Sequence, residues 1–221
     1  MSEILNYSAI IPVKNGMNYM IEAIESIYSQ TLLPSEIIIV DDHSTDLTKE
    51  TLVRRYPDVL LIDNVGQGQS EAMNLGIKRS SSEVVAFLDH DDLWIQNKQE
   101  VQLKILTDNK DLDAVTSGVV NFSEQGDSRN LGPARVFGAT SFRKDVFSKI
   151  GYLNGSISYV WAIEWWIRAE SKGIHHSTNV DIGLLRRVHT DNTGIVSKLE
   201  SRSDLFSILR SQTSRESQNE I

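Results

Sequence analysis

Three aspartates and a histidine occupy residues 89–92, directly after the apolar run VVAFL. Carboxylates crowded in this way repel one another, and a bound divalent cation would relieve the repulsion. Oxygen ligands without thiolate favour Mg²⁺ or Mn²⁺. On extended backbone, Asp89 and Asp91 point to the same side and could flank one ion, while His90 points away from them. The motif predicts a metal site, with a solvated turn or a helix cap as the alternative.

Two other acidic motifs fit this stretch poorly. In an EF-hand loop starting at Asp89, Trp94 would stand where glycine is obligatory. Phosphatases of the haloacid dehalogenase type carry their aspartate pair at the first strand with a threonine soon after it, whereas this pair follows the fourth apolar run and precedes Leu93. Neither class is favoured.

The elements around the motif predict an α/β fold. Short runs rich in β-branched residues indicate buried parallel strands at residues 8–13, 36–42, 59–63 and 84–89. Helical spacing fills the intervals at residues 18–30, 46–55 and 70–79. Right-handed crossovers then give a doubly wound parallel sheet, and ligands bind at the carboxyl ends of its strands. The polar segments 12–15, 41–46 and 89–92 all fall at that edge.

Three further segments carry local predictions. A helix is expected from Asp92, as its N-cap, to about residue 108. The Gly-, Ser- and Asn-rich residues 121–135 indicate a loop. DDHSTD is typical of an Asx-type turn, and GQGQSE (residues 66–71) is typical of a tight turn rather than a dinucleotide cradle, because Glu71 stands where the last glycine belongs.

Composition limits the possible partners. The chain has 221 residues, a net charge of −8 and a pI near 5.1, without a long Lys/Arg block, so we expect no nucleic-acid partner. It has no cysteine, no basic region before its first apolar run and no stretch of about 18 apolar residues. We therefore expect an uncleaved, cytoplasmic protein without a transmembrane segment, which leaves peripheral membrane contact and the oligomeric state open.

Four motifs in a fixed order resemble a known family. The stretches IIPVKN, IIIVDDHSTD, GQGQSEAMNLGI and VVAFLDHDD are similar to the nucleotide-sugar-binding half of family 2 glycosyltransferases with the GT-A fold. The resemblance is strong over residues 7–110. It continues more thinly to about residue 195 through FRKDVFSKIGYL, EWWIRAESKGI and LLRRVHTDNTG.

The resemblance implies a fold and a division of the chain. A Rossmann-like, mostly parallel sheet flanked by helices would be joined by a smaller C-terminal acceptor-side region. Residues 1–110 would form the nucleotide-sugar-binding half, 111–196 the acceptor-binding half of the same domain, and 197–221 a helical or frayed tail.

On the donor side, the resemblance assigns nucleotide-base recognition to Asp42. The end of the first strand would line the same pocket, through Pro12, Val13 and Asn15. The family's DxD motif matches Asp89 and Asp91: Asp91 would coordinate Mn²⁺ or Mg²⁺ at the donor diphosphate, and Asp89 would contact ribose or the metal shell. Such a metal stabilises the negative charge that grows on the leaving oxygens.

On the acceptor side, the resemblance offers Glu164 as the general base, with an ion pair to Arg168 at i+4 as the alternative. Ala162 stands where the family often has aspartate. Trp165 and Trp166 could contact the acceptor as a platform for a sugar ring, or belong to the core with Trp161.

Two further positions concern the donor phosphates. RRVHTDN resembles a late motif whose histidine reaches the metal or the diphosphate, which gives His189 and Arg187 roles beside Asp91, with a structural histidine as the alternative. Met73 replaces an arginine that is frequent in the family and helps to hold the donor.

The predicted function is that of a metal-dependent, inverting hexosyltransferase. It would move a sugar from a nucleotide-diphosphate donor, UDP-sugar being the first candidate, to a hydroxyl on a glycan, a lipid-linked acceptor or a small molecule. The alternative is a non-catalytic nucleotide-sugar-binding homologue that has lost its base, which the missing acids at Trp161 and Ala162 motivate.

Overall fold

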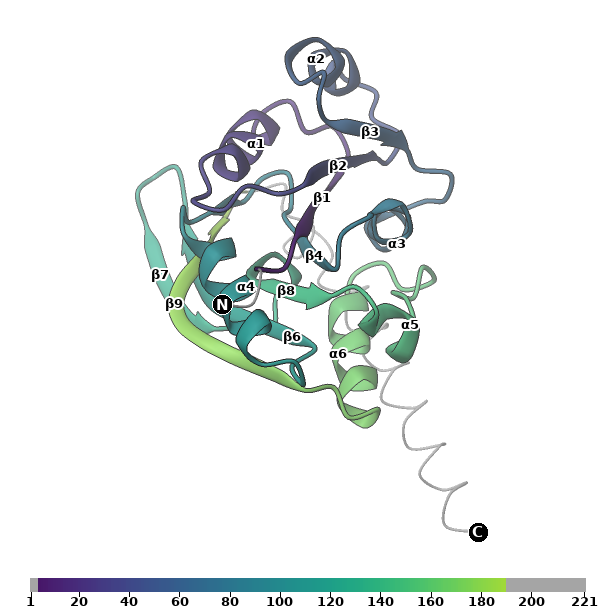
Figure 1. Ribbon diagram of the computed structural model, residues 1–221. Coiled ribbons are helices and arrows are strands. Elements are labelled where there is room, and N and C mark those ends of the chain that lie inside the picture. The colour runs from purple at the N-terminus through teal and green to yellow at the C-terminus, as the bar shows by residue number, and fades with distance from the viewer. Residues whose placement is uncertain (1–3, 190–221) are drawn as a thin grey trace.

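One mixed sheet organises the chain in the computed structural model, which describes residues 4–189. Within that range nine strands follow the order β3-β2-β1-β4-β8-β6-β9-β5, with β7 paired to β6 (Figure 1). The strands are β1 (Tyr7–Val13), β2 (Glu36–Asp41), β3 (Leu60–Asp63), β4 (Val84–Phe87), β5 (Leu93–Trp94), β6 (Ala114–Phe122), β7 (Ser128–Pro133), β8 (Thr140–Arg143) and β9 (His176–Arg187). The helices are α1 (Met20–Tyr28), α2 (Thr48–Arg55), α3 (Gln69–Arg79), α4 (Lys98–Asp108), α5 (Val146–Ile150) and α6 (Trp161–Ser171), with a short 3₁₀ turn at Phe137–Ala139.

The first four strands confirm the predicted parallel sheet. β1 pairs in parallel with β2 and β4, and β2 pairs in parallel with β3. Their ends are level, because Val13 is opposite Asp41 and Asp41 is opposite Asp63. The polar segments that follow β1 and β2 therefore start at one edge. β3 differs from the prediction of a buried strand: it is the outermost strand and is partly exposed.

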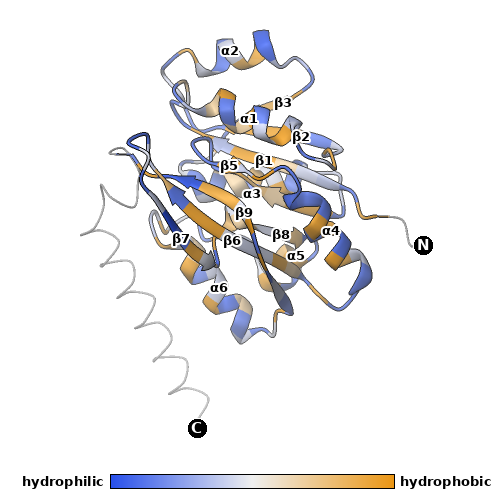
Figure 2. Cartoon of the chain, turned by 90° about the vertical axis from the view of Figure 1, so that its left-hand side faces the viewer, coloured by the Kyte–Doolittle hydropathy of each residue, from blue (hydrophilic) through white to orange (hydrophobic). Residues whose placement is uncertain are grey.

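The sheet has a hydrophobic layer on each face. Side chains on β1 alternate between the two: Ile10 packs in a cluster with residues of α3, α5 and α6, whereas Ala9 and Ile11 pack with α1 and α4. Figure 2 shows the hydrophobic colour concentrated in the strands and in the helix faces turned toward them. Alternation on an extended strand thus fills both layers and holds the strand ends rigidly in place.

The second half introduces antiparallel pairing. β8 runs antiparallel to both β4 and β6, while β9 runs parallel to β6. The predicted loop at 121–135 is wrong, because β6 extends to Phe122 and pairs with β7 in a hairpin. The Gly-, Ser- and Asn-rich composition marks only its turn, where Gly126 has a φ of 86°.

The segment after the aspartates also differs from its prediction. β5 comes first, and α4 begins at Lys98 with Asn97 as its N-cap residue, so Asp92 caps no helix. The predicted tail at 197–221 lies outside the described residues. No helix within residues 4–189 is both long and apolar enough to cross a membrane.

Candidate functional site

The three aspartates converge in a turn at the carboxyl edge of the sheet. The backbone N–H of Asp92 donates to the carbonyl of Asp89 at 3.1 Å. Carboxylate oxygens of Asp89, Asp91 and Asp92 lie within 4.8 Å of one another. The expected extended backbone would have aligned only the first two. A turn brings in Asp92 as well, and three hard oxygen donors at this spacing suit a divalent cation.

The electrostatics of this cluster are those of a crowded acidic site. Burial, and then the charge of Asp91, raise the pKa of Asp89 to about 7. Burial and the charges of Asp89 and Asp91 raise the pKa of Asp92 well above its ordinary value. These carboxyls are hard to ionise together unless positive charge is supplied. The donor set and its charge state therefore fit a bound Mn²⁺ or Mg²⁺.

His189 at the end of β9 lies beside the cluster. Its Nε2 is 2.9 Å from Asp91 Oδ2. The imidazole and the carboxylate are close enough to share one ion or one proton. The structure therefore brings together the two residues that the sequence placed in one site from positions 98 residues apart.

Arg187 braces the turn that carries the aspartates. Its backbone N–H donates to Asp92 Oδ1 at 2.8 Å, and its Nε donates to the carbonyl of Asp91 at 3.0 Å. Nη2 forms a 2.7 Å ion pair with Glu22 on α1. The side chain is 6% exposed. These contacts hold the aspartate turn against β9 and α1, which favours a positioning role over the expected phosphate contact.

Arg186 is the cation that the sequence reasoning missed. Its positive charge lowers the pKa of both Asp89 and Asp92, opposing the effect of burial. The signal was present in the pair Arg186-Arg187, because neighbours on a strand point to opposite faces and have different environments. Arg186 balances part of the negative charge at the site.

Asp42 organises the second part of the site. It is 6% exposed, and it accepts the backbone N–H of Gly68 at 3.0 and 3.1 Å and Asn64 Nδ2 at 2.7 Å. Gly68 has a φ of 90° and is the N-cap residue of α3, so the segment predicted as a tight turn is a bend at residues 65–68 followed by the first residues of the helix. In the same turn, Gln69 Nε2 donates to Asp89 Oδ1 at 2.6 Å. The start of α3 thus joins Asp42 to the aspartate cluster.

The end of β1 lies between these two parts. The carbonyl of Val13 accepts the backbone N–H of Asp42 at 2.7 Å. Asn15 has a φ of 52°, and its Oδ1 accepts the backbone N–H of Thr45 at 2.8 Å. Pro12 and Val13 are buried, whereas Asn15 is exposed. The three residues shape this edge, and Asn15 presents its side chain there.

His90 lies on the β1 side of the aspartate turn. Its ring hydrogen-bonds to the backbone of Pro12, and burial lowers the pKa of the imidazole. Its Cδ2 would be 3.2 Å from a Cβ built on Gly16, so the glycine leaves room for the ring. The prediction that His90 is directed differently from its neighbouring aspartates agrees with this position.

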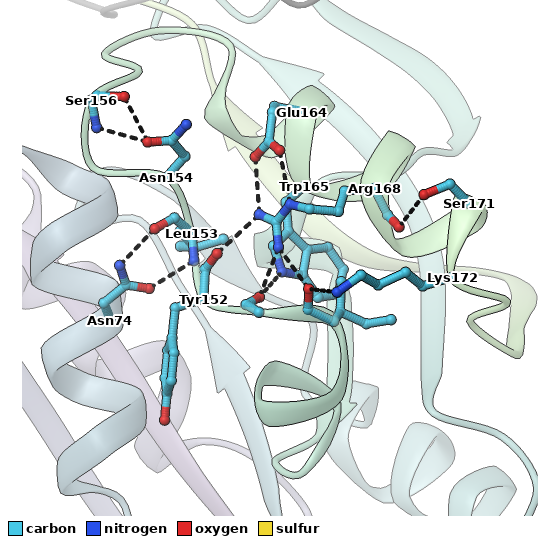
Figure 3. Close-up of polar contacts among 12 residues, drawn as sticks. Asn74, Tyr152, Leu153, Asn154, Ser156, Glu164, Trp165, Arg168, Ser171 and Lys172 are labelled. Atoms are coloured by element: carbon cyan, nitrogen blue, oxygen red, sulfur yellow. Dashed lines mark hydrogen bonds and ion pairs between the residues drawn. The ribbon is translucent and has the colours of Figure 1, made fainter. Parts of the chain in front are cut away.

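Glu164 holds an arginine on its own helix. Arg168 Nε and Nη2 donate to its two carboxylate oxygens at 2.8 and 3.0 Å (Figure 3). The other bonds of the guanidinium go to the backbone carbonyls that follow α5, those of Ile150, Gly151 and Tyr152. Both carboxylate oxygens are therefore engaged in ordering that backbone. This arrangement favours the ion-pair alternative for Glu164 over the role of general base.

Trp165 and Trp166 face the core. They are 0% and 3% exposed and pack against Phe137 and Phe142. Trp165 Nε1 donates to the carbonyl of Gly151 at 2.9 Å. Rings this deeply buried offer almost no surface for stacking a sugar, so their burial favours the core alternative.

Comparisons with known proteins show the family to which the chain belongs. The sequence profile described as Glycosyl transferase family 2 matches residues 8–171. The chain belongs to glycosyltransferase family 2. It is similar to an uncharacterised glycosyltransferase of Rickettsia typhi, with 34% identity over 230 residues that cover 90% of this chain and 70% of that protein.

Other relatives are matched over a smaller share of their length. An uncharacterised glycosyltransferase of Rickettsia bellii is 37% identical over 65% of this chain, but the match covers 20% of that protein. A protein of Escherichia coli named UDP-Glc:alpha-D-GlcNAc-diphosphoundecaprenol beta-1,3-glucosyltransferase WfgD is 33% identical over 46% of this chain and 41% of its own. The chain thus spans about a fifth of one of these relatives and most of another.

Solved structures confirm the GT-A-type fold. TarS of S. aureus (residues 1–349) superposes with a TM-score of 0.76 in complex with UDP-GlcNAc and 0.73 in complex with UDP. These matches cover 93% of this chain and 65% and 64% of the TarS chain, with 18% and 17% sequence identity. At that identity the likeness concerns the fold.

A large cavity lies at the other end of the sheet from the candidate site. It has a volume of about 1040 Å³, and its lining includes Arg143, Lys149 and Lys172. Arg143 is opposite Val84, the first residue of β4, whereas Asp89 follows the last residue of that strand. In a parallel sheet of this kind, the site is indicated by the chemistry of the strand ends rather than by cavity size.

Proposed function

We propose that the protein is a metal-dependent, inverting glycosyltransferase that moves a hexose from a nucleoside-diphosphate donor to a hydroxyl acceptor. The main supporting observation is a pair of hydrogen bonds from the start of α3. The backbone N–H of Gly68 donates to Asp42, and the side chain of Gln69 donates to Asp89. One rigid turn thereby fixes the spacing between a buried carboxylate that can recognise a nucleotide base and a carboxylate cluster that can hold a cation at a diphosphate.

A UDP-sugar is the first candidate for the donor. The name of the E. coli relative specifies UDP-Glc, and the TarS structures hold UDP and UDP-GlcNAc. Without a bound cation, the acidic chain would repel such an anionic donor. The acceptor is a glycan, a lipid-linked molecule or a small molecule with a free hydroxyl. The cytoplasmic location stays a prediction.

In the proposed reaction each residue at the edge has a distinct task. Asp42, with Pro12, Val13 and Asn15 beside it, binds and orients the nucleoside. Asp89, Asp91 and Asp92 would hold Mn²⁺ or Mg²⁺ together with His189. When bound, the cation supplies Lewis-acid stabilisation of the diphosphate as it leaves.

The arginines have two further tasks. Arg186 places positive charge near the departing phosphates, where it stabilises the charge that develops. Arg187 keeps the aspartate turn in position. The acceptor hydroxyl attacks from the face opposite the leaving group, so a single displacement inverts the anomeric centre.

A non-catalytic donor-binding protein is the second candidate. The observation in its favour is the engagement of both Glu164 carboxylate oxygens by Arg168. A glutamate that holds an arginine is poorly placed to take a proton from an acceptor. This candidate keeps the whole donor site and predicts binding of a nucleotide sugar without turnover.

Calorimetry of UDP binding with and without Mn²⁺ tests the donor site. We expect binding that requires Mn²⁺ and a loss of affinity of about 100-fold in Asp91→Asn, the order of effect that removal of a charged ligand produces. Asp108→Asn is the matched control, because Asp108 is an exposed residue at the end of α4. Metal-independent UDP binding that is equal in both variants contradicts the proposal. Release of UDP from UDP-glucose or UDP-GlcNAc separates the transferase from the binding protein.

A further inference from the structure

We propose that Glu71, on the first turn of α3, is the general base that deprotonates the acceptor hydroxyl. The inference rests on the proposed transferase function. It supplies a general base in place of Glu164, whose carboxylate is engaged by Arg168. It assigns a role in group transfer to a position that the sequence motifs marked only as the end of a turn.

The first observation is the position of Glu71 relative to the donor site. It lies three residues after Gly68, which bonds Asp42, and two after Gln69, which bonds Asp89. Asp42 and Asp89, the two carboxylates proposed to hold the donor, thus both accept hydrogen bonds from the start of the helix that carries Glu71. A base attached to this rigid turn would keep a fixed position relative to the donor.

The second observation is the direction of the side chain. A Cβ built on Gly155 would lie 1.9 Å from Glu71 Oε1, so the carboxylate reaches the loop between α5 and α6 and lies directly against this glycine. On its other side, Cβ and Cγ of Glu71 lie close to Gly66. The carboxylate therefore lies between the start of α3 and the loop between α5 and α6, and the proposal takes this junction as the place where the acceptor hydroxyl meets the donor.

The loop opposite Glu71 is held in a defined place. Asn74, one turn further along α3, donates from Nδ2 to the carbonyl of Leu153 at 2.8 Å and accepts the backbone N–H of Leu153 at 2.9 Å (Figure 3). The Glu164–Arg168 pair orders the backbone just before it, at Tyr152. The backbone just before Gly155 is thus held by side chains of two helices, α3 and α6.

The third observation is that Glu71, unlike several other glutamates, is not engaged by a partner. Glu22 is paired with Arg187, Glu124 accepts from Tyr19, and Glu164 is paired with Arg168. Within residues 4–189, the partly buried carboxylate of Glu71 makes no hydrogen bond or ion pair. It is therefore available to accept a proton.

A capping role would be the usual reason for glutamate at this position. The third residue of a helix often bonds back to the N–H of the N-cap residue. Here the N–H of Gly68 is bonded to Asp42, so Glu71 does not close a capping box. Its conformation needs another explanation, which general-base catalysis provides.

Proton, bonds and leaving group balance in this step. The acceptor O–H transfers its proton to the Glu71 carboxylate while the oxygen forms a bond to the anomeric carbon. The bond from that carbon to the diphosphate oxygen breaks, and its electron pair leaves with the nucleoside diphosphate. Glu71 then returns the proton to solvent.

The test measures UDP release from UDP-glucose and from UDP-GlcNAc with Mn²⁺ and water as the accepting hydroxyl, in full-length wild-type protein and in Glu71→Gln. We expect the variant to lose about 10²- to 10⁴-fold in kcat, the range attributed to general acid–base catalysis, and to bind UDP within about twofold of wild type. Glu50→Gln is the matched control, because Glu50 is also in the first turn of a helix, α2, and is exposed. It should retain wild-type kcat.

Azide rescue distinguishes a base from a structural residue. Azide attacks without losing a proton, so sodium azide should restore UDP release in Glu71→Ala and give a glycosyl azide that mass spectrometry detects. It should not accelerate the wild-type enzyme to a similar degree.

Three results would overturn the inference. Wild-type kcat in Glu71→Gln removes Glu71 from catalysis and leaves the transferase intact. Loss of UDP binding in Glu71→Gln makes the residue structural. Wild-type protein that binds UDP but releases none from either donor contradicts transfer itself and, with it, a base, while the donor site stands.

Discussion

The two halves of the molecule use their conspicuous residues differently. In the donor half, the polar residues that follow β1, β2 and β4 meet at one edge, where Asp42 bonds Gly68 and Gln69 bonds Asp89. In the second half, the conspicuous residues of α6 support the fold: Glu164 holds Arg168, and Trp165 lies in the core. The gathering of polar residues at parallel strand ends can thus be predicted from sequence, whereas the use of a side chain on a packed helix depends on its neighbours.

β9 connects the two halves. It begins beside β6 in the second half and ends with Arg187 and His189 against the aspartate turn of the first half. The donor site therefore depends on a strand that comes almost 100 residues later in the chain. The contrast between the halves concerns how their polar and aromatic side chains are used, since both halves contribute strands to one sheet.

The strongest test of the contrast is Trp165→Ala. Loss of a fully buried indole and of its bond to Gly151 should lower the free energy of unfolding by about 3–5 kcal/mol. UDP affinity of the folded protein should not change. Urea denaturation and calorimetry measure the two quantities. Ile163→Ala on the same helix is the control, because that side chain is 50% exposed and should change stability by about 0.5 kcal/mol or less. Weaker UDP-sugar binding at unchanged stability would restore the sugar-platform hypothesis.

The pH dependence of stability tests the charge crowding in the donor half. The folded pKa of Asp89 is about 7, above the ordinary value of 3.8, so the folded state keeps a proton that the unfolded state releases. Without metal, the contribution of Asp89 should therefore make the protein less stable as the pH rises from about 5 to 7, by about 2 kcal/mol. Urea denaturation in EDTA measures it as the difference between wild type and Asp89→Asn.

Mn²⁺ should reverse this trend, because metal binding favours the ionised carboxylate. The same slope in wild type and Asp89→Asn would show that the crowding has no energetic consequence, and the two halves would then differ less than proposed.

The smallest effect is expected for Glu164→Gln. Removing a charge that is paired with Arg168 and partly shielded from solvent should lower the free energy of unfolding by about 1–2 kcal/mol, while kcat for UDP release stays near wild type. Thermal denaturation and the UDP-release assay measure the two effects. If UDP release instead slows by about 100-fold or more at wild-type stability, the role of base returns to Glu164 and the contrast between the halves disappears.

The sequence by itself determined the parallel sheet of the proposed donor half. Alternating β-branched strands and helices require parallel pairing, and parallel pairing places the strand ends at one edge. It therefore predicted the parallel sheet of the first four strands and the proximity of Asp42, Asp89 and Asp91 to that edge. The family followed from the same motifs.

Only the tertiary structure decided how individual side chains are used. Asp92 accepts the backbone N–H of Arg187 instead of capping a helix, because β9 lies beside the turn. The positive charge of Arg186 lowers the pKa of Asp89, whereas Arg187 is engaged in holding the aspartate turn. Glu71 lies against Gly155, which belongs to the loop between α5 and α6. Each of these outcomes depends on a contact between residues far apart in the chain, and local spacing carries no information about such contacts.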